Sequence, residues 1–214
     1  YIRGGSLQKR LASEGPLPLV EILRISSQIA AGLAAAHEQG LVHRDIKPEN
    51  ILLEEGVERV TITDFGLARA VDDNSITQNG LIVGTPMYMS PEQARGEQVD
   101  QKSDLFSLGS VMYALCTGRP PYRADSSYGV MRRIIDESPT PIRELNPEIP
   151  EWLARIVELL MFREKANRFA SASEVHKLLD GCLSHVQQPE AISLPAIPGM
   201  TLGRSEISFL ETRR

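Results

Sequence analysis

The sequence contains few cysteines and no cysteine pattern that would organise a fold. Its 214 residues include only Cys116 and Cys182, and both stand in apolar segments with a helical pattern. Two isolated thiols favour free, buried side chains in a reducing compartment over a disulfide framework. None of the four histidines pairs with a cysteine at zinc-site spacing, so no structural metal is predicted.

The sequence also lacks long runs of positive charge and long apolar runs. The net charge is −5, and no cluster of Lys and Arg marks a nucleic-acid surface. Charges interrupt the apolar stretches within about a dozen residues, short of the ~20 that a membrane span requires. No signal peptide is predicted. We therefore expect a cytoplasmic globular piece without nucleic-acid or membrane contacts, although the parent protein could be tethered through other segments.

Apolar periodicity predicts a mostly α (α+β) chain. The first 15 residues suggest a connector with a short helix, and residues 67–93 show no period. Helices are expected from Pro18 to Gly40, from Leu105 to Cys116, over Ser127–Asp136, after Pro150 and after the capping pattern that begins at Ser171. Two β-prone runs, 51–53 and 60–63, predict a small hairpin-like pair.

The most informative segment is His43-Arg44-Asp45-Ile46-Lys47-Pro48-Glu49-Asn50, with Asp64-Phe65-Gly66 beginning fourteen residues after Asn50. A phosphoryl group in transfer carries negative charge that cations must neutralise, while one carboxylate orients the attacking hydroxyl. Asp45 suits the carboxylate role. Asn50 and Asp64 offer the oxygen ligands that Mg²⁺ prefers. This order and spacing indicate phosphoryl-transfer chemistry.

With the later Ser90-Pro91-Glu92, these motifs resemble the catalytic and metal loops of protein kinases. The stretch from Met87 to Gly96 resembles the bacterial, eukaryotic-type serine/threonine kinases most. The resemblance implies a protein-kinase-like large lobe over residues 1–182, with the small β pair beside the catalytic loop. Residues 183–214, which contain Pro189, Pro195 and Pro198, are expected to form a linker or tail.

The resemblance also implies roles for individual residues, with ATP and Mg²⁺ as cofactors. Asp45 would be the catalytic base, and Lys47 would contact the γ-phosphate and favour Ser/Thr acceptors on proteins. Asn50 and Asp64 would hold Mg²⁺ on the nucleotide.

Five further positions match structural residues of the family. His43 would support the ring of Phe65, and Glu92 would pair with Arg168, because a buried carboxylate needs such a partner. Asp104 would anchor the backbone of the catalytic loop. A simple charge at a helix N-terminus is the alternative explanation of Asp104.

Regulation is expected in the segment between Asp64 and Glu92. Arg44 is typical of kinases whose activation loop is phosphorylated, because a guanidinium pairs well with a phosphate. Thr85 resembles the loop threonine that contacts the catalytic residues, so Thr77 is the first candidate for autophosphorylation and Ser75 the second. Solvated loop hydroxyls are the alternative for both.

The first residues resemble the hinge between the two lobes of a kinase. The Ile2 backbone would face adenine, Ser6 could approach the ribose, and Leu52 would lie under the purine, although a Gly-Gly-Ser tract is also a generic linker. The sequence contains no Gly-rich loop and no small-lobe lysine with its glutamate. Because the chain starts at Tyr1, we expect a fragment that needs the small lobe of its parent and is nearly inert alone.

Two other functions remain open. A pseudokinase scaffold would bind partners without catalysis, but it would be expected to lack Asp45, Asn50 or Asp64, and all three are present. A small-molecule phosphotransferase would share the acidic motifs, but Gly84-Thr85-Pro86 and Ser90-Pro91-Glu92 favour a protein acceptor.

Overall fold

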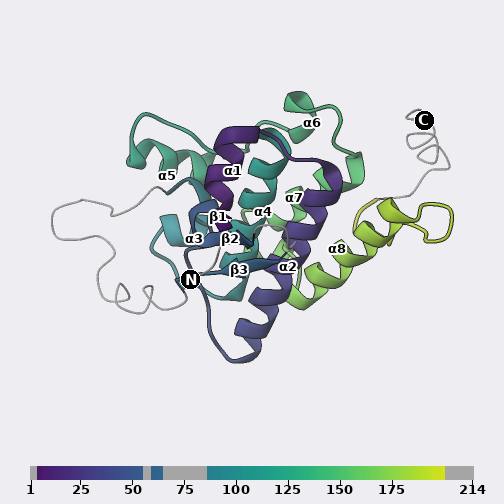
Figure 1. The fold of residues 1–214 in the computed structure, drawn as a ribbon. Coiled ribbons are helices and arrows are strands. Elements are labelled where there is room, and N and C mark those ends of the chain that lie inside the picture. Colours follow the sequence, from purple (N-terminus) through teal and green to yellow (C-terminus); the bar gives the residue numbers. More distant parts are fainter. Residues whose placement is uncertain (1–3, 55–58, 65–85, 201–214) are drawn as a thin grey trace.

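The computed structural model describes residues 4–54, 59–64 and 86–200 and shows a group of helices with a small sheet packed against it (Figure 1). The strands are β1 (Gly4–Ser6), β2 (Ile51–Glu54) and β3 (Val60–Ile62). The α-helices are α1 (Leu7–Glu14), α2 (Leu19–Glu38), α3 (Pro91–Ala94), α4 (Gln101–Thr117), α5 (Ser127–Asp136), α6 (Ile142–Leu145), α7 (Glu151–Leu160) and α8 (Ala172–Gln187). Short 3-10 helices are η1 (Pro48–Asn50), η3 (Pro86–Tyr88) and η4 (Lys165–Asn167).

Helix α4 is the centre of the core. Every residue from Ser103 to Cys116 is buried, which is the pattern of a helix surrounded by protein on all sides. The helix begins with a capping box in which the Asp100 side chain accepts from the backbone of α4 and the Ser103 hydroxyl accepts from Asp100 N. It ends at Gly118, whose φ of 74° suits glycine at this position. The position of α4 is therefore set by the core.

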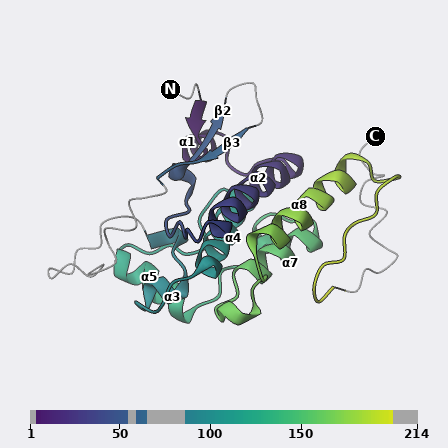
Figure 2. The same cartoon turned by 90° about the horizontal axis from the view of Figure 1, so that it is seen from below.

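Helix α2 lies beside α8 and also contacts α4 and β3 (Figure 2). By length and composition α2 could cross a membrane, but ten of its residues are buried against these neighbours. Its apolar residues Ile22, Ile25, Ile29 and Leu33 recur at three- and four-residue spacing, and Gly40 follows its end with φ of 72°. We therefore describe α2 as a core helix of this domain.

The sheet has the order β1-β2-β3, and both pairs of strands are antiparallel. Ile51 pairs with Ile62 and Leu53 with Val60, while Ser6 of β1 pairs with Leu52. This register places the residue before β2 opposite the residue after β3. The sheet thus brings the ends of the two sequence motifs together.

The expected mostly helical architecture with a small sheet is confirmed. Helix α5 occupies the predicted residues, and α2 and α7 begin directly after the prolines expected to open them. Strand β1 was not expected, and α8 extends to Gln187, beyond the point where its apolar pattern fades.

The capping pattern that opens α8 is only partly as expected. Ser171 accepts from the Glu174 backbone as predicted, but the Glu174 carboxylate accepts from Ala170 N at 2.8 Å instead of from Ser171 N. The Glu174 carboxylate thus binds the backbone N–H one residue before the N-cap residue Ser171.

Both cysteines are free and buried, in agreement with the prediction. Burial raises the pKa of each thiol to about 12, so both stay protonated at neutral pH and are poor nucleophiles. They act as small apolar side chains of α4 and α8.

The chain after α8 returns toward the core. Ile197 is buried within the hydrophobic core, and the Pro195 ring lies against Gly181 of α8. His185 contacts the carbonyl of Ile192 through Nδ1 at 2.6 Å. This segment therefore contacts the helices at Ile192, Pro195 and Ile197, and the boundary at residue 182 remains a prediction.

A buried ion pair joins α3 to the segment before α8. The carboxylate of Glu92 accepts from both terminal nitrogens of Arg168, at 2.7 and 2.9 Å, and from the Ser103 hydroxyl at 2.6 Å. Burial by itself raises the pKa of Glu92, but the hydrogen bonds from Arg168 and Ser103 outweigh it and lower this pKa to about 2. Glu92 is therefore ionised in the folded protein at neutral pH.

The Arg168 guanidinium uses all five of its N–H groups. Two of them bond to Glu92, and the other three donate to the carbonyls of Phe162, Lys102 and Arg163. Its central carbon lies 5.0 Å from the centre of the Phe106 ring. A charge that is only 4% exposed is thus fully compensated.

We predict that Gly109→Ala destabilises the protein by about 1–3 kcal/mol. A Cβ at Gly109 would lie 2.8 Å from Leu160 Cβ and from Met161 Cγ, at the contact between α4 and the end of α7. Urea unfolding of both proteins measures the difference. Gly5→Ala, where no atom lies within 4 Å of the added Cβ, is the control. Equal destabilisation by both substitutions would contradict a close contact at Gly109.

We predict that acid weakens the Glu92–Arg168 pair. Because the folded pKa of about 2 lies below the ordinary value of 4.5, the pair contributes fully above about pH 4.5, and its contribution is lost as the pH falls through 2. This lowering of the Glu92 pKa corresponds to a contribution on the order of 3 kcal/mol to the free energy of unfolding.

Urea unfolding of the wild type and Glu92→Gln at several pH values tests this prediction. The difference in unfolding free energy should be largest at neutral pH and narrow below pH 4.5. Glu97→Gln, which changes an exposed carboxylate in the next loop, should cost little at any pH. If the difference in unfolding free energy between the wild type and Glu92→Gln did not vary with pH, the lowered pKa of Glu92 would be contradicted.

Candidate active site

Asp104 holds the backbone of the predicted catalytic loop against α4. Its carboxylate is fully buried and accepts from His43 N at 2.9 Å and from Arg44 N at 2.8 Å. Nε2 of His37 lies 2.8 Å from the same carboxylate. A buried carboxylate is stable only with such partners, so Asp104 and the loop stabilise each other.

His43 connects the loop to the strand that leads to Asp64. Its Nδ1 accepts from Asp45 N at 3.2 Å, which assigns the ring proton to Nε2, and Nε2 donates to Thr63 O at 2.8 Å. The side chain is 2% exposed. Both ring nitrogens are engaged with backbone, so His43 has a positioning role and is not available as a base.

Asp45 presents a carboxylate at the surface of this buried framework. Its side chain is 52% exposed, while the next residue, Ile46, is buried. Lys47 Nζ lies 2.7 Å from Asp45 Oδ2, and Asn50 Nδ2 lies 2.9 Å from the same oxygen. Both bonds converge on Oδ2, so Oδ1 is the oxygen that a hydroxyl group can approach.

Asn50 and Asp64 come together through the backbone that precedes Asp64. Thr63 N donates to Asn50 O at 2.9 Å, and the Thr63 hydroxyl donates to the same carbonyl at 3.2 Å. Asn50 Nδ2 donates to Asp45 O and Oδ2, which leaves its amide oxygen outside these bonds. Asp64 is exposed.

These two side chains fit a magnesium ion carried by a nucleotide. An amide oxygen and a carboxylate are hard ligands, and Mg²⁺ is commonly held by one or two protein carboxylates together with substrate phosphates. Within the described ranges, no three His, Cys, Asp or Glu side chains gather into a site made by protein alone. The donor set therefore suits Mg²⁺ shared with phosphates.

Two residues of the site have backbone conformations that L-residues seldom adopt. Arg44 has φ of 68° and Asp64 has φ of 63°. Each such residue costs of order 1–3 kcal/mol, and this strain concentrates at functional sites. Arg44 directly precedes Asp45, and Asp64 is itself a predicted metal ligand.

The predicted nucleotide-side residues are only partly described. Leu52 and Ser6 lie opposite each other across β1 and β2, and the Ser6 hydroxyl accepts from Lys9 N at 3.4 Å as the N-cap of α1. The predictions for Ile2, Phe65, Ser75, Thr77 and Thr85 concern residues outside the described ranges.

Sequence reasoning did not identify two side chains of the site. His37 contacts Asp104, and Gln93 Nε2 donates to Arg44 O at 2.7 Å. Gln93 stands three residues after Ser90, a capping pattern that was readable in the sequence. That pattern does not predict the contact of Gln93 with Arg44. No sequence pattern around His37 predicts its contact with Asp104.

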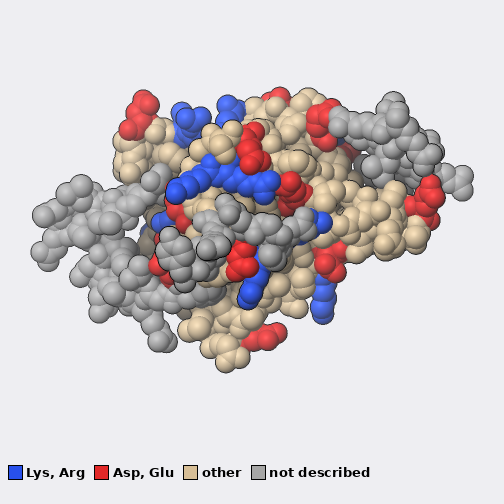
Figure 3. All heavy atoms as spheres, in the orientation of Figure 1, with Lys and Arg blue, Asp and Glu red and all other residues tan. Residues whose placement is uncertain are grey.

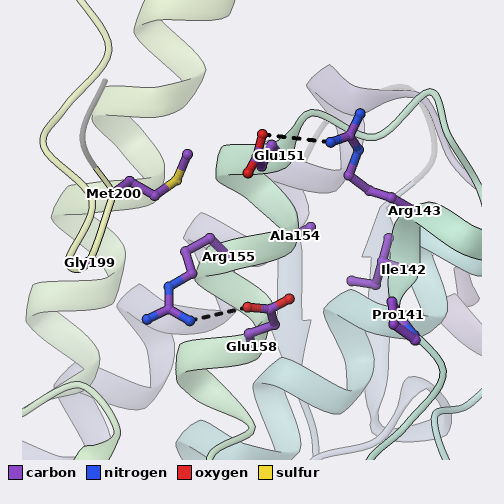
Figure 4. Close-up of a pocket in the computed structure, with 9 residues that line it drawn as sticks. All are labelled: Pro141, Ile142, Arg143, Glu151, Ala154, Arg155, Glu158, Gly199 and Met200. Atoms are coloured by element: carbon purple, nitrogen blue, oxygen red, sulfur yellow. Dashed lines mark hydrogen bonds and ion pairs between the residues drawn. The ribbon is translucent and has the colours of Figure 1, made fainter. Parts of the chain in front are cut away.

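A separate hollow of about 470 Å³ lies between α6, α7 and residues 199–200 (Figure 4). The close-up shows Arg143 paired with Glu151, and Arg155 paired with Glu158. None of the lining residues belongs to the predicted site, so this hollow does not locate the chemistry. On the face in Figure 3 the described acidic and basic side chains are interspersed.

Comparison with known proteins agrees with this geometry. The family model described as protein kinase domain matches residues 1–190. The probable serine/threonine-protein kinase PknB of Bifidobacterium longum is 40% identical over 177 residues, which cover 81% of this chain and 25% of that protein. Serine/threonine-protein kinase PknL of Mycobacterium tuberculosis is 37% identical over 189 residues, 88% of this chain and 47% of that protein.

A third relative, named serine/threonine-protein kinases drp72, comes from Corynebacterium efficiens. It is 37% identical over 206 residues, which cover 96% of this chain and 38% of that protein. The chain thus spans between a quarter and a half of the length of these curated relatives. With the family model matching most of its residues, the chain belongs to the protein kinase domain family.

Proposed function

We propose that this chain carries the catalytic loop of a protein kinase that transfers the γ-phosphoryl group of ATP to Ser or Thr hydroxyls of proteins. The observation that carries the proposal is the Asp45 carboxylate, exposed on a buried framework with Lys47 and Asn50 both bound to its Oδ2. The names of the relatives support the Ser/Thr assignment.

The residues of the loop have different roles in the proposed reaction. Asp45 Oδ1 accepts a hydrogen bond from the acceptor hydroxyl. This bond orients the hydroxyl oxygen for attack on the γ-phosphorus, and the Asp45 carboxylate then receives the hydroxyl proton. Lys47 is close enough to Asp45 to place a positive charge beside the group in transfer. Asn50 and Asp64 would hold Mg²⁺, which supplies neutralisation of the phosphate charge when it is bound with ATP.

The proposal includes regulation through the segment before Glu92. We assign Thr77 as the site of activating phosphorylation and Arg44 as a partner of the phosphate, on the strength of the sequence motif. It also includes a reducing, cytoplasmic location, which is supported by the two free and buried thiols.

We predict that Asp45→Asn lowers kcat by about 10²–10⁴-fold, because an amide cannot accept the hydroxyl proton. Labelled ATP, Mg²⁺ and a generic protein acceptor provide the assay, followed by mapping of phosphosites, with Thr77 expected among them. The polypeptide assayed should also contain a Gly-rich loop and a lysine of the kind with which protein kinases hold the nucleotide phosphates. The 214-residue chain assayed alone should be nearly inert.

Glu49→Gln is the matched control for Asp45→Asn. Glu49 is an exposed carboxylate of the same loop, and no role is assigned to it. Its kcat should stay close to that of the wild type. If the folded wild-type polypeptide binds ATP and Mg²⁺ without transferring phosphate, a pseudokinase scaffold replaces the proposed enzyme.

We predict that Asp64→Asn weakens Mg²⁺ binding in the presence of ATP by on the order of 10–100-fold. Loss of the carboxylate removes a charged oxygen ligand, while the bonds from the Thr63 N–H and hydroxyl to Asn50 O are unaffected. Activity measured across a series of Mg²⁺ concentrations gives the shift. An unchanged Mg²⁺ requirement would remove Asp64 from the metal site.

A further inference from the structure

Gln93 connects α3 to the catalytic loop through an amide whose two ends do different things. Its Oε1 accepts from Ser90 N at 3.1 Å and from the Ser90 hydroxyl at 3.0 Å, within the capping box of α3. Its Nε2 leaves the helix and donates to Arg44 O at 2.7 Å. The amide oxygen of Gln93 therefore caps α3, while its amide nitrogen binds the catalytic loop.

The carbonyl of Arg44 belongs to the peptide group that joins Arg44 to Asp45. The N–H of the same peptide group, Asp45 N, donates to His43 Nδ1 at 3.2 Å. Gln93 and His43 therefore bind opposite sides of one peptide plane. The preceding peptide is also held, because Arg44 N donates to Asp104 Oδ1 at 2.8 Å.

This peptide plane needs external support because of its conformation. Arg44 has φ of 68°, in the left-handed region that disfavours a side chain. The direction of the Arg44 carbonyl sets where the chain continues, and the next Cα carries the Asp45 carboxylate. Rotation of this peptide would move the carboxylate away from the hydroxyl that it orients.

The chemistry of the side chain separates the two roles. A capping box works with Glu or Gln at this position, since it requires only an acceptor. A carboxylate has no N–H for Arg44 O and would place negative charge against a carbonyl oxygen. The contact with the loop therefore requires the amide that Gln93 supplies, whereas the cap does not.

We propose that Gln93 is a positioning residue for Asp45, acting through the peptide bond between Arg44 and Asp45. This inference rests on the proposed function and deepens it. Gln93 has no contact with substrate in this assignment. It fixes the orientation of the peptide that presents the carboxylate, from a helix located 49 residues further along the chain.

Three variants separate the contact with the loop from the cap. Gln93→Glu keeps the acceptor for Ser90 and loses the donor. Gln93→Met keeps the length of the side chain and loses both. Ser90→Ala removes the hydroxyl partner in the cap and leaves the Gln93 bond to Arg44 O intact.

We expect Gln93→Glu and Gln93→Met each to lower kcat by at least about fivefold, with little change in the KM for ATP. Gln93→Glu retains the cap, so its loss of thermal stability should come only from the missing bond to Arg44 O. Ser90→Ala should keep kcat within about twofold. Amide exchange of residues 43–47, followed by mass spectrometry, should accelerate in both Gln93 variants and not in Ser90→Ala.

A Gln93→Glu protein with wild-type kcat and wild-type exchange in residues 43–47 would overturn the inference. The same conclusion would follow if Ser90→Ala lost as much kcat as the Gln93 variants, since the cap would then explain the effect. If the wild-type polypeptide itself transfers no phosphate, the proposed function fails separately. The exchange measurement on the 214-residue chain then decides whether Gln93 holds the Asp45 peptide.

Discussion

One buried carboxylate determines how the catalytic loop lies on the protein. Asp104 is fully buried in α4, and it gains compensation from the backbone N–H groups of His43 and Arg44 and from His37. Helix α4 is itself buried from Ser103 to Cys116, so most of its contacts are with the core. The loop takes its position from the core, and the exposed carboxylate of Asp45 takes its position from the loop.

The polar groups of the domain fall into two kinds that differ in how completely they are bonded. Arg168 uses all five N–H groups, and Glu92 accepts from Arg168 and Ser103. Asp45 instead has both side-chain bonds on one oxygen and is half exposed. Saturated buried pairs hold elements together, while an incompletely bonded group at the surface is able to exchange partners with a substrate. This contrast supports the proposal that the chemistry takes place at Asp45, and it indicates a structural role for Glu92.

Local patterns in the sequence predict the parts of the fold that depend on local physics. Helices α2 and α5 follow from apolar spacing, and the pair of strands follows from β-prone runs beside the motif. Strand β1 has the sequence Gly-Gly-Ser, without a β-prone side chain, and exists through pairing with β2. The contacts of Gln93 with Arg44 and of His37 with Asp104 span 49 and 67 residues, so no local pattern encodes them. The motif predicts which groups react, whereas the supporting contacts arise from tertiary packing.

The strain at Arg44 and Asp64 explains why the support is so extensive. A residue in the left-handed region persists only where surrounding contacts favour it over relaxed alternatives. For Arg44 these contacts are Asp104 on the peptide before it, and Gln93 and His43 on the peptide after it. The residue before Asp64 is held by Asn50 and by His43. Because His43 belongs to both sets, the two strained positions share one network, and energies within such a network are not additive. The directions of the two acidic side chains are therefore coupled through the backbone that carries them.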